Sequence, residues 1–345
     1  MRSALVNTLL VICSVLFAFF LLELGTRVLR GEWDLDNFLE LKMDLFRGAY
    51  PSEFDESLGW SLKPGRHPKN IWDKTVHVLD DQTRSNGRAR QLDKHSIVLA
   101  VGDSFTFGDQ VDDFESWPAH LEEMSGMTVI NGGVFGYGID QAYIRMRLLA
   151  DRYNPSIVVL SFIPDDIYRS ELSFRTAVPK PYFDIDVDGE LMLVADHVMP
   201  PSEPKQLDPL RNALGYSLFA YRLLKSVAPV WWLQGGDKSV RVHENGPEVV
   251  CKLFQQMGRF VEDRGIDAYI LVQYEMKKLD QDKEVVDKVL SCVDPNSINV
   301  VDLRSPFSEL AEKDRKDYES LFIGHMSSKG NRFVASELKQ AIRNN

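Results

Sequence analysis

Short apolar runs that alternate with amphipathic stretches from residue 96 onward constrain the fold of this chain more than any other feature. The runs occupy residues 96–102, 128–133, 156–162, 267–273 and 298–303. Strands that are buried on both faces of a parallel sheet read as continuous apolar runs, whereas the helices between them read as amphipathic. The sequence therefore predicts an α/β fold with three layers (α/β/α), in which helices cover both faces of a central, mostly parallel sheet.

Helical patterns fill most of the chain between and after these runs. The predicted helices cover residues 113–126, 140–153, 247–265, 283–293 and 327–343. Because helices of this length suffice to connect parallel strands, the pattern agrees with the predicted sheet.

One long segment, residues 169–245, interrupts this alternation. It contains a hairpin pattern at 182–196, a proline-rich bend at 199–205 and one apolar helix at 210–227. We expect an insert that is either a lid over a site or a surface excursion from the core.

An uncharged stretch near the N-terminus, residues 4–22, is long enough to cross a bilayer, which takes about 20 apolar residues. The run is longer than that of a removable signal peptide, and no good small-x-small cleavage site accompanies it. Cys13 lies inside the run, where it cannot serve as a lipoprotein anchor. We therefore expect one uncleaved transmembrane helix. Arg2 precedes the run and Arg27 and Arg30 follow it, so the positive-inside rule selects neither orientation.

Composition divides the chain into three parts. Residues 1–30 form the expected anchor, residues 31–95 are polar and irregular, and residues 96–345 hold the α/β pattern with its insert. We expect 31–95 to be a stalk and leader that packs on the α/β domain.

Charge and cysteine usage exclude several classes of partner. The net charge of −11 comes from 40 basic and 51 acidic residues without a basic cluster, which argues against nucleic acid. No metal or cofactor is expected, because CxxC, HxH, HExxH and GxGxxG patterns are missing. Cys251 and Cys292 form either one disulfide outside the cytoplasm or two separate buried thiols. The sequence indicates no oligomeric state.

Four polar or glycine-rich motifs follow predicted strands or precede the last helix. They are GDS (102–104), NGGVFGYG (131–138), FIPDDI (162–167) and GHMSSKGN (324–331). Ligands in a parallel α/β sheet bind outside the carboxyl ends of the strands, so we expect these motifs to meet there. A serine hydroxyl attacks an ester only with help from a base, and histidine has a suitable pKa. The motifs therefore predict Ser104 as nucleophile and His325 as its general base.

In this order the motifs resemble the SGNH (GDSL-type) hydrolase family. The resemblance covers residues 96–343 and is most specific in VGDSFTFGDQV (101–111) and HMSSKGNRFVA (325–335). The N-terminal apolar run, together with LGWSLKP (58–64) and SNGRAR (85–90), is similar to that of membrane-anchored bacterial members.

This resemblance implies a fold and a set of site residues. It implies a flavodoxin-like three-layer fold, with Ser104 as nucleophile and His325 as base. It also implies an oxyanion hole formed by the backbone amides of Ser104 and Gly136 and by the side chain at the position of Asp165.

Two positions depart from the family pattern. Asp165 stands where the family has an asparagine that donates to the oxyanion, and losing one such donor costs about 10²- to 10³-fold in rate. The family's acid precedes the histidine by two or three residues, where this chain has Ile323 and Phe322. The remaining candidates for the acid are Asp317, Glu319 and Asp302. The alternative without an acid is a Ser–His dyad.

The resemblance implies a membrane-anchored SGNH-like serine esterase or acyl (O-acetyl) transferase. Its globular domain would lie in the periplasm or otherwise outside the cytoplasm, and its substrates would be small acyl esters or acylated cell-envelope polysaccharide. The alternative, which the two departures favour, is a catalytically degenerate SGNH domain that binds a glycan or assists envelope assembly.

Overall fold

The chain forms two compact units. The computed structural model describes residues 2–30, 33, 35, 37–39, 50–67, 74–90, 92, 97–175, 178–200, 209–228, 231–232 and 239–344. The larger unit comprises Ala49–Pro200 and Ser239–Asn345, and the smaller comprises Met1–Gly48 and Pro201–Lys238. The division at residues 30/31 and 95/96 that the sequence suggests remains a proposal.

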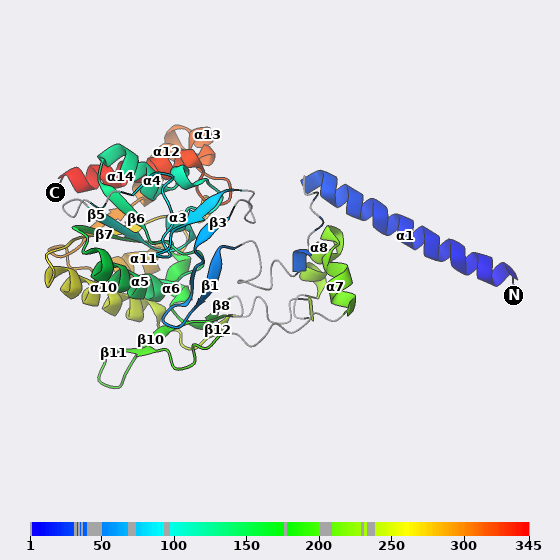
Figure 1. Ribbon diagram of the computed structural model, residues 1–345, viewed down its shortest axis with the longest axis horizontal. Helices are drawn as coiled ribbons and strands as arrows, with labels where there is room; N and C mark the ends of the chain where they lie inside the picture. Colours follow the sequence, from blue (N-terminus) through cyan, green and yellow to red (C-terminus); the bar gives the residue numbers. More distant parts are fainter. Residues whose placement is uncertain are drawn as a thin grey trace. The chain divides into compact units, whose positions relative to one another are not determined.

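The larger unit is built on a five-stranded sheet in which all neighbouring strands are parallel. Its strands are β5 (Ile97–Val101), β6 (Thr128–Asn131), β7 (Ile157–Phe162), β13 (Asp267–Val272) and β14 (Asn299–Asp302). Their spatial order is β14-β13-β7-β5-β6, which in chain order is the 2-1-3-4-5 arrangement of flavodoxin-like sheets (Figure 1). Each strand lies inside one predicted apolar run, and β5 and β7 are buried throughout. The predicted fold class is thereby confirmed.

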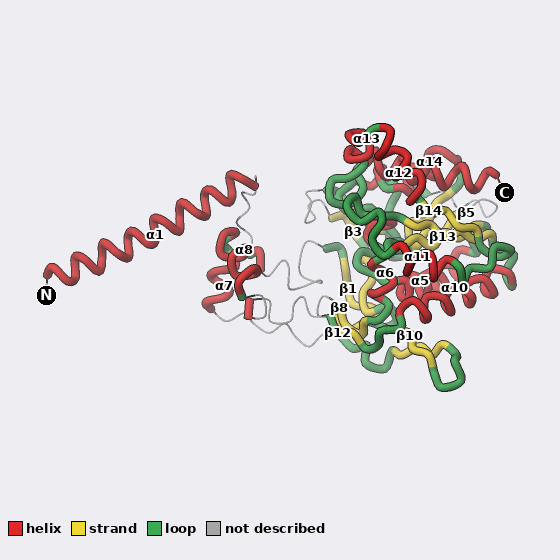
Figure 2. The backbone as a smooth tube through the Cα atoms, turned by 180° about the vertical axis from the view of Figure 1, so that it is seen from behind, coloured by secondary structure: helices red, strands yellow, loops and turns green. Residues whose placement is uncertain are grey.

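Helices cover both faces of this sheet (Figures 1 and 2). On one face lie α4 (Trp117–Ser125), α12 (Arg304–Lys313) and α14 (Ser328–Asn344). On the other face lie α5 (Ile139–Tyr153), α10 (Gly246–Glu262) and α11 (Lys283–Leu290). Short helices are α3 (Ser104–Phe107), η1 (Asp113–Glu115), α6 (Asp165–Arg169) and α13 (Arg315–Ser320).

The predicted helices are present, but the first is divided. The stretch 113–126 holds η1 and α4, and Ser116 separates them because its side chain accepts a hydrogen bond from the Ala119 amide as the N-cap of α4. Pro118 near the start of α4 and Gly126 after its end fit the usual preferences for these positions.

The segment before the sheet forms two hairpins. β1 (Ser52–Asp55) pairs with β2 (Gly59–Leu62), and β3 (Gly65–His67) pairs with β4 (Val76–Val78). Farther along, the Arg84 amide donates to the Asn131 carbonyl at the end of β6 (2.9 Å). The leader therefore makes direct backbone contact with the edge of the sheet.

The part of the insert in the larger unit is antiparallel. β8 (Leu172–Arg175) pairs with β9 (Val178–Pro179) and β12 (Val240–Arg241). β10 (Tyr182–Ile185) and β11 (Leu191–Val194) form the predicted hairpin. Most of the predicted proline-rich bend at 199–205 lies outside the described residues.

Cys251 and Cys292 form a disulfide with a Cα–Cα distance of 5.2 Å. Cys251 lies in α10 and Cys292 follows α11, so the bond ties together two helices on the same face of the sheet. The sequence leaves two interpretations open, one disulfide or two separate buried thiols, and the structure contains the disulfide.

The smaller unit contains α1 (Arg2–Arg30), α7 (Pro209–Gly215) and α8 (Leu218–Val227). Among the described residues, α1 is the helix long and apolar enough to cross a membrane, over Val6–Leu29. The prediction of one helix over 210–227 is wrong. The chain ends α7 at Gly215 and restarts at Ser217, whose hydroxyl accepts from the Ala220 amide as an N-cap (3.0 Å).

Candidate active site

Ser104 begins α3 directly after β5. Gly102 makes this turn possible because its φ is +155° and a Cβ there would stand 2.4 Å from the Ser161 carbonyl oxygen. Asp103 is the N-cap of α3 and accepts from the Phe105 amide (2.9 Å). Ser104 therefore lies at the carboxyl edge of the sheet, at the switch point between β5 and β7 where ligands bind in such folds.

His325 reaches Ser104 from the loop before α14. Its Nε2 lies 3.0 Å from Ser104 Oγ. The His325 amide donates to Gln110 Oε1 (2.7 Å), and the imidazole lies against the Phe105 ring with the centroids 5.0 Å apart. Two residues far apart in the sequence thus have the geometry of a nucleophile and its base.

The loop that carries His325 is fixed by Asn331. Its side-chain oxygen accepts from the Trp117 amide (2.9 Å), and its amide group donates to the carbonyls of Met326 (3.2 Å) and Ser327 (3.1 Å). Asn331 is buried, so these bonds are shielded from water. The last motif therefore supplies both His325, the predicted base, and the residue that positions its loop.

The environment of His325 favours the neutral imidazole. Burial lowers its pKa below the ordinary 6.5, and Arg169 lowers it further, while Asp103 and Glu275 act in the opposite direction. A neutral ring accepts the Ser104 proton when Nε2 is the unprotonated nitrogen.

Asp109 is a site residue that sequence reasoning missed. This buried carboxylate lies 3.7 Å from His325 Nε2, on the same ring nitrogen that faces Ser104. A triad acid, by contrast, orients the ring through Nδ1. Asp109 lies within VGDSFTFGDQV, but a motif does not show which side chains turn toward the base.

The three sequence candidates for the acid each have a different partner. Asp317 pairs with Lys329, and Glu319 pairs with Arg315 (2.8 Å). Asp302 accepts from the Tyr274 hydroxyl (2.8 Å) and the Arg304 amide (2.9 Å). Their assignment as the triad acid stays a prediction.

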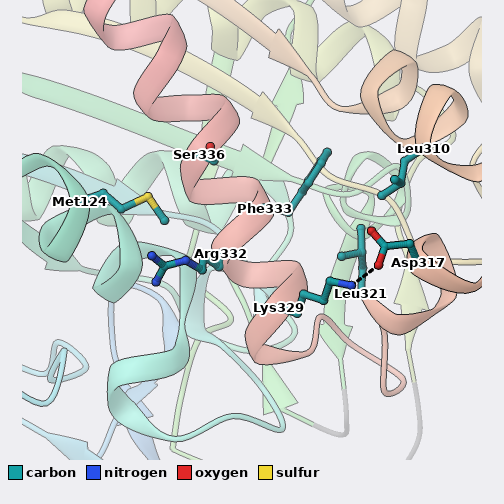
Figure 3. A pocket seen from close by; sticks show the side chains of 8 residues that line it. All are labelled: Met124, Leu310, Asp317, Leu321, Lys329, Arg332, Phe333 and Ser336. Atoms are coloured by element: carbon teal, nitrogen blue, oxygen red, sulfur yellow. Dashed lines mark hydrogen bonds and ion pairs between the residues drawn. The ribbon is translucent and has the colours of Figure 1, made fainter. Parts of the chain in front are cut away.

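Asp317 also lines a pocket of about 360 Å³ on the outside of α14 (Figure 3). The other lining residues are Met124, Leu310, Leu321, Lys329, Arg332, Phe333 and Ser336. Figure 3 shows Asp317 directed toward Lys329 across this pocket, which lies among α4, α12, α13 and α14. This pocket is distinct from the Ser104–His325 pair.

Gly136, the second expected oxyanion donor, lies in a loop that the leader holds. The Trp60 indole donates to the Phe135 carbonyl (3.1 Å), and the Tyr137 hydroxyl donates to the Trp60 carbonyl (2.5 Å). Gly136 has φ +77°, and a Cβ there would stand 3.3 Å from Arg175 Nε. The leader motif LGWSLKP thus contacts the chain on both sides of Gly136, through the Phe135 carbonyl and the Tyr137 hydroxyl.

Asp165 starts α6 and forms an ion pair with Lys278 (2.9 Å), with about a third of its side chain exposed (33%). The next residue, Asp166, is buried and accepts from the Ile163 amide (2.9 Å). Burial and the neighbouring Asp103 raise the pKa of Asp166. Asp165 stands where the SGNH resemblance implies an asparagine that donates to the oxyanion. The ammonium group of Lys278 offsets the negative charge of Asp165 at this position.

Two arginines near Gly136 were also missed. Arg169 Nη1 donates to Asp103 Oδ2 (3.4 Å) and to the Tyr137 carbonyl (3.3 Å), and it pairs with Asp166. Burial and the charge of Arg169 lower the pKa of Arg175 to about 10. Arg175 belongs to β8 of the insert, so no strand-end motif points to it. Two guanidinium groups therefore lie next to the loop that carries Gly136.

No metal-binding cluster of three or more His, Cys, Asp or Glu side chains occurs among the residues that the structure describes. The expected absence of a metal stays a prediction.

Several solved structures are similar to this chain. A G-D-S-L family protein from Desulfitobacterium hafniense is 16% identical, with 71% of this chain and 98% of that chain covered and a TM-score of 0.40. A GDSL-like lipase from Bacteroides thetaiotaomicron is 12% identical, with coverages of 74% and 92% and a TM-score of 0.39. The lipase/acylhydrolase from Enterococcus faecalis is 12% identical, with coverages of 72% and 96% and a TM-score of 0.40.

No family model matches the chain, and no curated protein matches it. The sheet order and the Ser104–His325 distance are observed in this chain and do not depend on its similarity to other proteins. In the order of its motifs and their place at the strand ends, the chain resembles the SGNH (GDSL-type) hydrolases.

Proposed function

We propose that this protein is an SGNH-type serine ester hydrolase or acyltransferase. The observation that carries the proposal is the 3.0 Å distance between Ser104 Oγ and His325 Nε2 at the carboxyl edge of the sheet. Motif residues from opposite ends of the α/β domain meet there in hydrogen-bond contact, which a purely structural serine does not require.

In the proposed reaction, Ser104 Oγ attacks the ester carbonyl carbon while His325 Nε2 takes its proton. The tetrahedral oxyanion lies against the backbone N–H groups of Ser104 and Gly136. His325 then returns the proton to the leaving alkoxide, and an acyl-serine remains. Water, or the hydroxyl of an acceptor, then attacks the acyl-serine while His325 takes its proton. The bond to Ser104 Oγ breaks, His325 gives the proton to that oxygen, and the acyl group leaves as an acid or a new ester.

Charged neighbours take over the tasks of the two missing family residues in this proposal. The guanidinium groups of Arg169 and Arg175 offset the negative charge that develops beside Gly136. Asp109, 3.7 Å from His325 Nε2, stabilises the transient imidazolium. In this arrangement Asp165 remains paired with Lys278.

We further infer that α1 anchors the protein in a membrane and that the larger unit lies outside the cytoplasm, in the periplasm of a bacterial cell. The apolar length of α1 supports the first inference, and the Cys251–Cys292 disulfide supports the second. An anchored esterase in that compartment meets acyl esters of the envelope, so acylated polysaccharide is the proposed substrate class.

A catalytically degenerate, glycan-binding domain is the second candidate. It is favoured by Asp165, a carboxylate paired with Lys278 in the motif that supplies a donating asparagine in the family. Such a domain would keep the fold and the Ser104–His325 contact but show no Ser104-dependent turnover.

Hydrolysis of p-nitrophenyl acetate by the full chain in detergent tests the proposal. Ser104→Ala is expected to lower kcat/KM by about 10³-fold or more, because the attacking oxygen is removed. Equal melting temperatures of the two proteins would show that the loss is chemical. Unchanged turnover in Ser104→Ala would contradict the nucleophile assignment, and no turnover in the folded wild type would favour the degenerate domain.

A further inference from the structure

The smaller unit joins α8 to α1 at the point where the apolar run of α1 ends. Glu23 is the first charged residue after the uncharged stretch 4–22. Its carboxylate accepts from the Ser217 hydroxyl (2.6 Å) and from the amides of Leu218 (3.1 Å) and Phe219 (2.9 Å). A side chain of the anchor helix therefore caps the N-terminus of α8, where negative charge is stabilising.

Arg27 reinforces this junction one turn farther along α1. It is 8% exposed, pairs with Glu23 (2.5 Å) and donates to the Tyr216 carbonyl (3.1 Å). The break between α7 and α8 is thus held on α1 by both a carboxylate and a guanidinium. These are charge-assisted bonds, which are stronger than neutral ones.

The contact continues into the apolar run itself. The rings of Phe19 and Phe219 meet edge to face with their centroids 5.8 Å apart. Phe19 and Glu23 are about 6 Å apart along the helix axis, at 1.5 Å per residue. The uncharged stretch 4–22 is about 28 Å long by the same measure, close to the hydrocarbon thickness of about 30 Å. With 4–22 in a bilayer, α8 begins at the boundary between hydrocarbon and headgroups.

The unit presents apolar and basic side chains together. Large apolar side chains are exposed on α7, on α8 and in the residues next to them: Leu210 (60%), Tyr216 (51%), Leu223 (45%), Val227 (66%) and Trp231 (42%). Arg222 and Lys225 on α8 are exposed as well. Aromatic, aliphatic and basic residues in this combination are typical of helices that lie in the plane of a membrane interface.

We propose that α7 and α8 form a membrane-interface element, which rests on a bilayer surface with anionic headgroups beside the anchor α1. Leu223 and Val227 enter the acyl boundary, and Arg222 and Lys225 meet lipid phosphates. The occupant of the exposed apolar face is lipid, because the contacts with Phe19 and Glu23 fix α8 at the depth where lipid headgroups begin. This part of the insert is therefore a membrane contact, and the proposal is independent of catalysis.

Spin-label accessibility in vesicles tests the proposal. The full chain with Cys13→Ser, reconstituted in phosphatidylethanolamine and phosphatidylglycerol, carries a nitroxide at Leu223→Cys or Val227→Cys. The matched control is Val187→Cys, a fully exposed residue in the hairpin of the larger unit. We expect labels at 223 and 227 to collide more with oxygen, which partitions into lipid, than with a water-soluble nickel chelate. The label at 187 is expected to show the reverse preference.

Two other results would overturn the proposal. Labels at 223 and 227 that are as accessible to nickel as the label at 187 would place α8 in water. Labels shielded from both reagents would show that protein, either the larger unit or a second copy, covers this face. As a second variant, Glu23→Ala removes the bonds from α1 to Ser217 and to the first amides of α8, and the preference for oxygen at position 223 is expected to be lost.

Discussion

The hydroxyl of Ser104 lies between two acceptors, His325 Nε2 at 3.0 Å and Asp103 Oδ2 at 3.3 Å. Asp103 also accepts from the Phe105 amide as the N-cap of α3 and pairs with Arg169 (3.4 Å), whereas the imidazole of His325 is the group that takes a proton and passes it on near neutral pH. Whether the Ser104 proton can be removed therefore depends on the protonation state of His325.

The first prediction concerns the pH dependence of the reaction. Because burial and Arg169 lower the pKa of His325, the free enzyme keeps its base neutral to below pH 6.5, and activity is lost only as pH falls through that lowered pKa. The acid limb of kcat/KM against pH is therefore expected below pH 6.5. Asp103→Asn, which preserves a capping side chain, removes a charge that raises this pKa and is expected to move the limb lower still. An acid limb above pH 6.5 in the wild type would contradict this account.

Among individual residues, the sequence predicts those that lie in recognisable motifs. Ser104 and His325 are such residues, and they lie together. Arg175 and Asp109 cannot be found in the same way, because they become site residues only through the path of the insert and the turn after α3. Asp165 lies shortly after β7, as the sequence predicts. Its ion-pair partner Lys278 comes from another loop, so the motif does not indicate it.

Among the elements, the leader positions the catalytic loops. Arg84 is fully buried and donates to the carbonyls of Phe107 (2.6 Å), Gly108 (2.6 Å) and Val111 (2.7 Å), which follow Ser104 in the chain. Its guanidinium also lies over the Phe107 ring at 4.8 Å. One leader side chain thus satisfies backbone carbonyls of the turn that follows Ser104, the proposed nucleophile.

Replacing this residue tests the role of the leader. Arg84→Met leaves three buried carbonyls without their donor and removes one ion-pair partner of Asp113, which also pairs with His77, so the free energy of unfolding is expected to fall by about 3 to 5 kcal/mol. Arg88→Met is the matched control, since Arg88 forms an exposed pair with Glu123 and is expected to change stability by at most about 0.5 kcal/mol. Urea denaturation measures both. Equal stabilities of the two variants would contradict the positioning role.

The strands were predictable because each is a short apolar run. β5, β6, β7 and nearly all of β13 are buried, and burial on both faces leaves the same signature in any parallel sheet, whereas β14 at the edge is only partly buried. The break between α7 and α8 could not be predicted in this way, although Ser217 is a good N-cap residue. Its cap is completed by Glu23, 194 residues away in sequence, and an isolated apolar pattern over 210–227 gives no sign of that partner.

For the molecule as a whole, the helix α1 and the Cys251–Cys292 disulfide both bear on the compartment in which the larger unit lies. α1 is long enough to hold the chain in a bilayer, and Cys251–Cys292 requires an oxidising environment on the side where the larger unit folds. Cys13 lies in α1 and is a free thiol. The number of reactive thiols in the native protein therefore reports the side of the membrane on which the larger unit lies.

Counting thiols in cells checks this topology. Cells that produce the protein are quenched with acid, and the denatured chain is treated with a maleimide that adds mass at each free thiol. We expect one adduct, at Cys13, before reduction, and three after it, because a bridged pair does not react. The double variant Cys251→Ser with Cys292→Ser is the control and should give one adduct in both samples. Three adducts before reduction would mean that the cysteines are reduced in the cell, and the larger unit would then belong on the cytoplasmic side.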